Sequence, residues 1–196
     1  KEITLPDNCV SGGEGDVYIK DGWAFKIYHD KNKALNEEKF DELKKLEKEN
    51  IIKPESLIYD NKGIVIGYMM KAVPKCFPLS RLITNDFRNQ YNISNEQILK
   101  IIQQMKETFE YIHSKGCLVI DGNEMNYLVD EKFENVYFID VDSYQTQKYN
   151  ANAYSPSTLD PIAEKNKKFS IYSDWFIFAV VSCTLLVGIH PFKGNY

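Results

Sequence analysis

The chain has few cysteines, and their spacing fits neither a metal site nor a redox motif. Its four cysteines among 196 residues include no C-x-x-C pair. We therefore expect separate reduced thiols in a cytoplasmic protein. No N-terminal stretch has the charged and then apolar pattern of a signal peptide. Lysines are mixed with acidic residues throughout, at a net charge of −4, which argues against nucleic-acid binding by this portion.

The chain also lacks an apolar run long enough to cross a membrane. The best candidate, Trp175 to Gly188, has fourteen residues. As a helix it would span roughly 21 Å, against roughly 30 Å for the hydrocarbon core of a bilayer. We expect a buried helix that Asp174 caps, and no membrane contact. Neither a repeat nor a low-complexity tract is present, and a hydrophobic content of 43% suffices for a sizeable core.

The most informative feature that is present is an acidic residue five positions before an amide. Asp121 and Asn126 have this spacing, and a second acid, Asp140, follows an apolar run. Phosphoryl transfer from a metal-bound nucleotide needs one acid near a hydroxyl nucleophile, and an amide and another acid at the metal ion. Alone this pattern is a weak signal, because loops are rich in both residue types.

Glycines near the N-terminus strengthen the signal. Gly12, Gly13 and Gly15 precede an apolar stretch suited to a strand. Glycine allows the backbone to approach an anion closely, so the loop could cover phosphates, although a simple hairpin turn is the alternative. Alternation in the run 23–28 would point Lys26 beneath this loop. The alternative for Lys26 is a residue that protects an edge strand from aggregation.

A stretch rich in Glu, Lys and Leu predicts a helix from about residue 32 to residue 49. A glutamate on its inner face could hold Lys26 as an ion pair. Glu38 and Glu42 both lie near that face, and we choose Glu38. Most of the other charges on this helix are expected to face solvent.

Three more segments have clear local signals. Residues 56–70 predict two strands joined by a hairpin at 60–63. A long helix is expected from Ser94 to Ser114, opened by a capping box and closed by a glycine. The polar segment 143–173 is expected to be exposed.

The ordered series of motifs resembles the protein-kinase fold through nearly the whole chain. The resemblance implies an α+β, bilobal fold, with an antiparallel β-sheet N-lobe in residues 1–72 and a mainly helical C-lobe in residues 73–196. Residues 140–145, 174–176 and 190–192 narrow it to bacterial and phage kinase-like domains associated with helix-hairpin-helix proteins. The matching motif positions are Gly12, Gly15, Val17, Ala24, Lys26, Asp121, Asn126 and Asp140.

This resemblance implies an ATP- and Mg²⁺-dependent phosphotransferase, of the serine/threonine protein-kinase type. Asp121 would be the catalytic base, Lys26 would contact the α and β phosphates, and Asn126 with Asp140 would hold Mg²⁺. Asp142 would be either a further metal ligand or the cap of a turn. The expected cofactor-binding residues are Gly12, Gly13, Gly15, Val17, Ala24, Lys26, Glu38, Met70, Asn126 and Asp140.

The chain departs from the kinase pattern at several positions. Val119 and Ile120 stand where His and Arg precede the catalytic acid, and Asn123 replaces a lysine. Val141 and Asp142 replace Phe and Gly of D-F-G. A small-molecule kinase and a nucleotide-binding pseudokinase scaffold therefore remain alternatives, while the long polar segment that follows favours a protein substrate.

Kinase-like domains continue with several helices after the central apolar helix. The resemblance therefore implies that the C-terminal helices are absent or truncated in this chain. We expect that a further domain or a partner covers the apolar helix.

Overall fold

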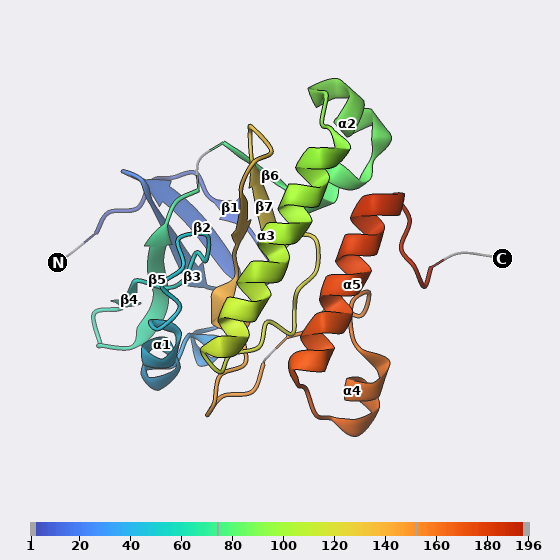
Figure 1. Cartoon of the computed structure of the whole chain (residues 1–196). Coiled ribbons are helices and arrows are strands. Elements are labelled where there is room, and N and C mark those ends of the chain that lie inside the picture. Colours follow the sequence, from blue (N-terminus) through green and yellow to red (C-terminus); the bar gives the residue numbers. More distant parts are fainter. Residues whose placement is uncertain (1–2, 74, 152, 194–196) are drawn as a thin grey trace.

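The computed structural model describes residues 3–73, 75–151 and 153–193. The chain has an α+β structure, as predicted, with a five-stranded antiparallel sheet built by its first part. A three-stranded antiparallel sheet and most of the helical residues follow. In Figure 1 the larger sheet lies on the left, and the helices α3 (Asn95–Ser114) and α5 (Ile171–Val187) lie to its right.

The larger sheet has the strand order β1-β2-β3-β5-β4. Lys26 lies in the middle of this sheet, opposite Val17 on one neighbouring strand and opposite Tyr68 on the other. Directly opposed residues share a face, so these three side chains point the same way. The strands are β1 (Val10–Ser11), β2 (Gly15–Lys20), β3 (Trp23–Tyr28), β4 (Ser56–Tyr59) and β5 (Val65–Lys71).

The predicted hairpin between β4 and β5 is confirmed. Asp60 Oδ1 accepts hydrogen bonds from the N–H groups of Lys62, at 2.9 Å, and Ile64, at 3.0 Å. Gly63 takes the positive φ of 77° that the turn requires. The second sheet has the order β6-β7-β8, formed by β6 (Cys76–Pro78), β7 (Tyr127–Asp130) and β8 (Val136–Phe138).

The long helix α3 agrees with its prediction. Ser94 Oγ accepts from the N–H of Gln97, and Gln97 Oε1 accepts from the N–H of Ser94, so the capping box is formed. Gly116 closes the helix with a φ of 69°. The two short helices of this part of the chain are α2 (Asn85–Tyr91) and α4 (Pro161–Asn166).

The helix predicted from residue 32 to residue 49 is much shorter in the structure. A 3₁₀ turn occupies Lys31–Lys33, and α1 runs only from Glu37 to Leu43. Extended backbone at Asn36 interrupts the helix, and its side chain caps α1. Helix-forming residues fill the whole stretch, but the helix ends at Leu43 and a turn follows. This turn allows both Leu43 and Leu46 to be fully buried.

The apolar helix α5 begins before the predicted residue. Its N-cap is Ser170, which forms a capping box with Ser173, so the prediction of Asp174 as the cap is wrong. Asp174 lies in the first turn and is fully buried. At 17 residues, α5 is too short to cross a membrane, and no other helix of the described residues is long and apolar enough either.

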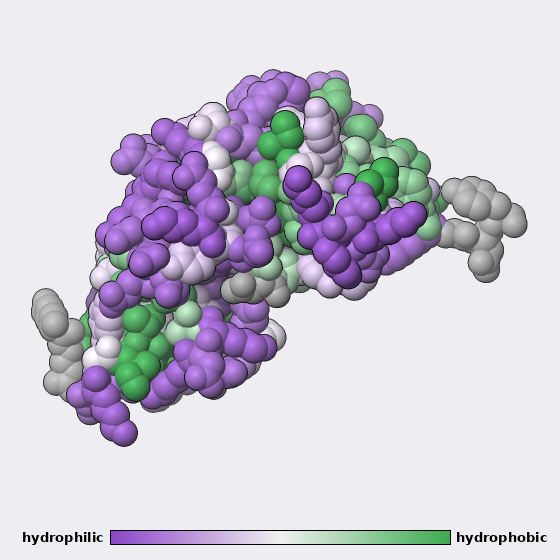
Figure 2. Space-filling view, turned by 90° about the horizontal axis from the view of Figure 1, so that it is seen from below, coloured by the Kyte–Doolittle hydropathy of each residue, from purple (hydrophilic) through white to green (hydrophobic). Residues whose placement is uncertain are grey.

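The end of α5 carries exposed apolar side chains. Most of the face in Figure 2 is hydrophilic, and hydrophobic surface shows in two places, at the lower left and from the upper middle towards the right. Large exposed side chains in this part of the chain include Leu186, Val187, Ile189 and Phe192. The expectation that a further segment or partner covers this helix therefore stays a prediction.

The segment 143–173 is only partly exposed, in contrast to the prediction. Tyr144, Thr146 and Thr158 are buried, and Leu118 forms a two-way backbone bridge with Gln145. The polar composition predicted exposure because a sequence does not distinguish hydroxyl side chains that are buried from those that face solvent.

Candidate functional site

A cleft of about 600 Å³ lies beneath the glycine loop, between the larger sheet and residues around β7 and β8. This volume is in the range of small-molecule sites, about 300 to 1,000 Å³. Nine of the ten predicted cofactor-binding residues line it. They are Gly12, Gly13, Gly15, Val17, Ala24, Lys26, Met70, Asn126 and Asp140.

A larger groove, of about 1030 Å³, lies on the opposite face of the sheet. Phe25, Ile27 and Met69 line it, and they alternate with the cleft-lining residues of the same strands. It contains none of the predicted site residues. The predicted site residues therefore gather at the smaller cleft.

Two glycines of the loop have different physical roles. A side chain at Gly13 would meet nothing within 4 Å, so this backbone is open to approach by a ligand. A Cβ at Gly15 would lie 2.3 Å from the carbonyl oxygen of Ile27. Gly15 is thus required by the close pairing of β2 with β3, and only Gly13 has the open surroundings that the phosphate hypothesis needs.

Lys26 is the buried cation of the cleft. Its Nζ donates to Asp140 Oδ1 at 2.6 Å and to the two carboxylate oxygens of Asp142 at 3.1 and 2.9 Å. Burial by itself lowers the pKa of this lysine, but the charges of Asp142 and Asp140 outweigh burial and raise it. Lys26 therefore carries a positive charge at neutral pH.

Asp142 is hydrogen-bonded on both carboxylate oxygens. Besides the two contacts from Lys26, Oδ2 accepts from the Tyr28 hydroxyl and Oδ1 from the Tyr68 hydroxyl, each at 2.6 Å. An ionised carboxylate has about four acceptor positions, and here four donor contacts fill them. The carboxylate also lies within 4.8 Å of those of Glu14 and Asp140, a grouping that could hold a metal ion, so the metal-ligand role of Asp142 stays a prediction.

Asp140 differs from Asp142 in exposure and in the direction of its pKa shift. Its side chain is 31% exposed, against 4% for Asp142. Burial, followed by repulsion from Asp142, raises the pKa of Asp140 to about 6. Burial also opposes ionisation of Asp142, but Lys26 and the tyrosine hydroxyls hold the pKa of Asp142 below its usual value. Asp140 is therefore the carboxylate of this pair that can turn to a metal ion.

Asp121 and Asn126 lie together as their spacing predicted. The Asn126 amide donates to the Asp121 backbone carbonyl at 2.6 Å and to Asp121 Oδ2 at 3.2 Å. These contacts leave the Asn126 carbonyl oxygen for other ligands. Burial raises the pKa of Asp121, and hydrogen bonds from Asn123 and Asn126 oppose that shift. A raised pKa makes a carboxylate a better proton acceptor.

The buried Asp174 holds the loop that carries Asp121. Its carboxylate accepts from the backbone N–H groups of Val119, at 2.8 Å, and Ile120, at 2.9 Å. His113 Nε2 lies 2.8 Å from the same carboxylate, so this histidine also helps to hold Asp174 in place. Ile120 has a φ of 59°, a rare conformation for a β-branched residue, and the Asp174 contact helps to hold it.

Glu38 does not pair with Lys26, so the prediction made for it is wrong. Glu38 Oε2 accepts from the Tyr149 hydroxyl at 2.9 Å, and Lys148 lies 3.9 Å away. The inward-facing charged residue of α1 is Lys39, whose Nζ donates to the Asp142 backbone carbonyl at 2.6 Å. Because α1 starts only after Asn36, its inner face differs from that of the longer predicted helix.

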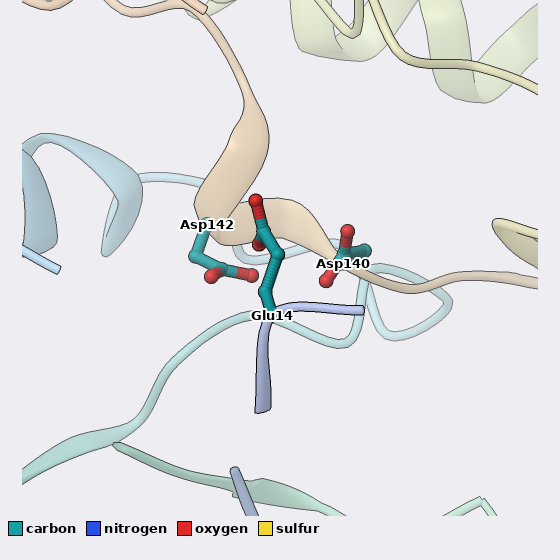
Figure 3. A group of neighbouring side chains, drawn as sticks. All are labelled: Glu14, Asp140 and Asp142. Atoms are coloured by element: carbon teal, nitrogen blue, oxygen red, sulfur yellow. The ribbon is translucent and has the colours of Figure 1, made fainter. Parts of the chain in front are cut away.

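Glu14 was missed by the sequence reasoning. Its Oε2 lies 3.5 Å from Lys26 Nζ, and its carboxylate is grouped with those of Asp140 and Asp142 within 4.8 Å. Figure 3 shows the Glu14 side chain between the two aspartates. Its position within the glycine loop was the available signal, since that loop was already expected to lie over Lys26.

We expect Asp140 to make stability depend on pH in an unusual direction. Its pKa is raised from 3.8 to about 6, so the folded protein binds this proton more tightly than the unfolded chain. The stabilisation is full below the unfolded pKa and is lost as the pH rises through the folded one. Urea unfolding of the metal-free protein and of Asp140→Asn, compared across this window, measures it. A difference between the two proteins that does not change with pH would contradict the assignment.

No protein-family model matches the chain. A curated relative, the muscle M-line assembly protein unc-89 of Caenorhabditis elegans, is 25% identical to it over 200 residues. The match covers 98% of this chain, and the chain spans about 2% of the length of that relative. The similarity is thus distant and of the size of one domain.

Proposed function

We propose that this chain is an ATP- and Mg²⁺-dependent phosphotransferase with a kinase-like, bilobal fold. Residues 1–72 would form one lobe and residues 73–196 the other, with the nucleotide between them. The observation that carries the proposal is the convergence of Lys26, Asn126 and Asp140 on one cleft under a glycine loop. These residues come from segments far apart in the chain, and a structural core has no need to gather them at a cleft.

The cleft suits a nucleotide in its size and its lining. Val17, Ala24 and Met70 supply apolar surface that a purine ring could contact. Tyr68, Lys71 and Val73 also line the cleft, and the backbone of residues 68–73 could hydrogen-bond to the adenine edge. Lys26 would exchange its contact with Asp140 for the α and β phosphates, and Gly13 leaves the loop backbone open to them.

The oxygen atoms near Lys26 suit Mg²⁺, which prefers carboxylate and carbonyl ligands. Asp140 and the Asn126 carbonyl oxygen would hold the ion beside the phosphates. When bound, Mg²⁺ would neutralise charge on the transferring phosphoryl group. Asp121, bonded to Asn126, would orient the acceptor hydroxyl and take its proton.

The acceptor is proposed to be a serine or threonine hydroxyl of a protein. The long segment after Asp142 supports this choice, because it lies next to the loop of Asp121 through the Leu118–Gln145 bridge. A panel of generic proteins and hydroxyl-bearing small molecules, incubated with radiolabelled ATP, tests the choice. Label on the small molecules alone would identify a small-molecule kinase instead.

Thermal unfolding with ATP, with and without Mg²⁺, tests nucleotide binding directly. A ligand present at 100 times its Kd stabilises a protein by about 2.7 kcal/mol, so a clear rise in Tm is expected with MgATP. Lys26→Met should remove most of the rise, because the phosphates lose their buried cation. The matched control is Lys53→Met, which removes a lysine paired with Glu55 outside the cleft.

Two results would contradict the phosphotransferase proposal in different ways. If MgATP leaves the Tm of the wild-type protein unchanged, nucleotide binding is excluded. If MgATP raises the Tm but no acceptor is labelled, the chain is a nucleotide-binding pseudokinase scaffold.

A further inference from the structure

We propose that Asp142, and not a glutamate of α1, is the residue that positions Lys26 for the nucleotide. This inference rests on the proposed function of Lys26 as the phosphate-binding lysine. Asp142 would then position the Lys26 side chain, a role that differs from the two suggested by the sequence, which were a metal ligand and the cap of a turn.

The first support is the geometry of the Lys26–Asp142 pair. Lys26 is 6% exposed and Asp142 5% exposed, and the ammonium contacts both carboxylate oxygens, at 2.9 and 3.1 Å. A contact to both oxygens fixes the direction of the lysine side chain more firmly than a contact to one. Asp140, by comparison, is bonded to Lys26 through one oxygen only and is the more exposed acid.

The second support is that the sheet itself orients Asp142. Tyr28 follows Lys26 by two residues on the same face of β3, and Tyr68 lies directly opposite Lys26 on β5. Each tyrosine hydroxyl donates to a different oxygen of Asp142 at 2.6 Å. The Lys26 ammonium also lies 5.3 and 5.8 Å from the two ring centroids. The two tyrosine hydroxyls therefore hold the Asp142 carboxylate at the position where it contacts the lysine.

The third support comes from α1, whose buried charged side chain is a lysine and not a glutamate. Lys39 is 3% exposed, and its Nζ donates to the backbone carbonyl of Asp142 at 2.6 Å. A lysine at this place cannot pair with Lys26, and instead it ties the helix to the backbone of the positioning residue. Glu38, beside it, points to Tyr149.

One short segment consequently carries both the lysine anchor and the proposed metal ligand. Asp140 and Asp142 flank Val141 in a tight turn, in which the Ser143 hydroxyl donates to the Asp140 carbonyl at 2.8 Å. A displacement of this turn would move Lys26 and Asp140 together. A displacement of α1 would reach Lys26 through Lys39 and the Asp142 backbone.

Chemical labelling of Lys26 tests the assignment without any need for catalysis. The probe is trinitrobenzenesulfonate, which reacts with neutral amines, and mass spectrometry reports the modified fraction of Lys26 over time. Asp142→Asn removes the carboxylate that holds the Lys26 ammonium through both oxygens and leaves Asp140 and Glu14 beside it. The lysine side chain should then reach solvent more often and be labelled about tenfold faster, the factor that corresponds to one lost hydrogen bond between charged groups. Glu38→Gln should leave the rate unchanged. Equal rates in Asp142→Asn and wild type, or a faster rate in Glu38→Gln, would overturn the proposal.

Two further measurements separate positioning from a general loss of structure. Tyr28→Phe removes one hydrogen bond to Asp142 but keeps both charges and the ring, so it should fold and should raise the KM for ATP about threefold, with kcat nearly unchanged. If Asp142→Asn does not fold, this variant decides the question, and a KM equal to wild type would refute the assignment. If the wild-type protein neither binds nor turns over ATP, the proposed function fails while the labelling result still reports on the pair.

Discussion

Replacement of Asp121 by asparagine is expected to reduce kcat about 10²- to 10⁴-fold and to leave the Kd for MgATP nearly unchanged. An amide has the shape of the carboxylate but cannot accept the proton of the acceptor hydroxyl. Asp121 does not line the cleft, so the nucleotide should still bind. Initial rates of phosphate transfer, with binding measured by calorimetry, give both quantities.

Two features of the loop make this substitution a clean test. Asn126 also donates to the Asp121 backbone carbonyl, at 2.6 Å, and this contact survives the change of side chain. Glu124→Gln is the matched control, because it removes the same charge from the same loop. Equal turnover by wild type and Asp121→Asn would exclude Asp121 as the base, and a similar loss in Glu124→Gln would assign the effect to the charge of the loop.

Replacement of Asp174 by alanine is expected to lower the free energy of unfolding by about 3 to 5 kcal/mol. The carboxylate is fully buried and accepts from the N–H groups of Val119 and Ile120. Alanine would leave both donors without a partner in a site that water does not reach. It would also release the backbone of Ile120, which has an unfavourable φ of 59°. Urea denaturation with a constant m-value measures the loss.

Asp174→Asn is the informative companion of the alanine variant. Asparagine keeps one oxygen acceptor, so we expect a smaller loss of stability than with alanine. A loss below about 1 kcal/mol for alanine would mean that the loop finds other partners, because an unsatisfied buried donor costs about 1 to 3 kcal/mol. Since the loop carries Asp121, both variants should also lose more turnover than nucleotide affinity.

The local elements of the fold were predictable from local patterns. Alternating apolar residues, the Asp60–Gly63 turn and the Ser94 capping box each act over a few residues, and the structure has the hairpin and α3 as predicted. The prediction was poorest where tertiary packing competes with propensity. The stretch from residue 32 to residue 49 is rich in helix formers, yet only Glu37–Leu43 is helical in α1.

The cleft residues were predicted from the order of their motifs, and the partners of Lys26 were not. Glycines before a strand and a lysine in the next strand act at short range, so Gly13 and Lys26 could be placed on one cleft from spacing alone. The ion pair of Lys26 depends on residues more than a hundred positions away. Helical periodicity offered Glu38, but the side chain that faces inward from α1 is Lys39.

By itself the sequence determined the hairpin of β4 with β5 and the helix α3, because hydrogen bonds between near neighbours and the burial of one face decide those elements, but it did not determine the extent of α1. It also determined that Asp121 and Asn126 share a loop, since five residues cannot separate far. Only the tertiary structure decided that Asp142 holds Lys26 and that Glu14 joins the acidic group. A buried charge forms its ion pair with the group that packing brings within about 3 Å. Because a buried charge has lost its water, its interaction energy falls strongly as the distance to that group grows.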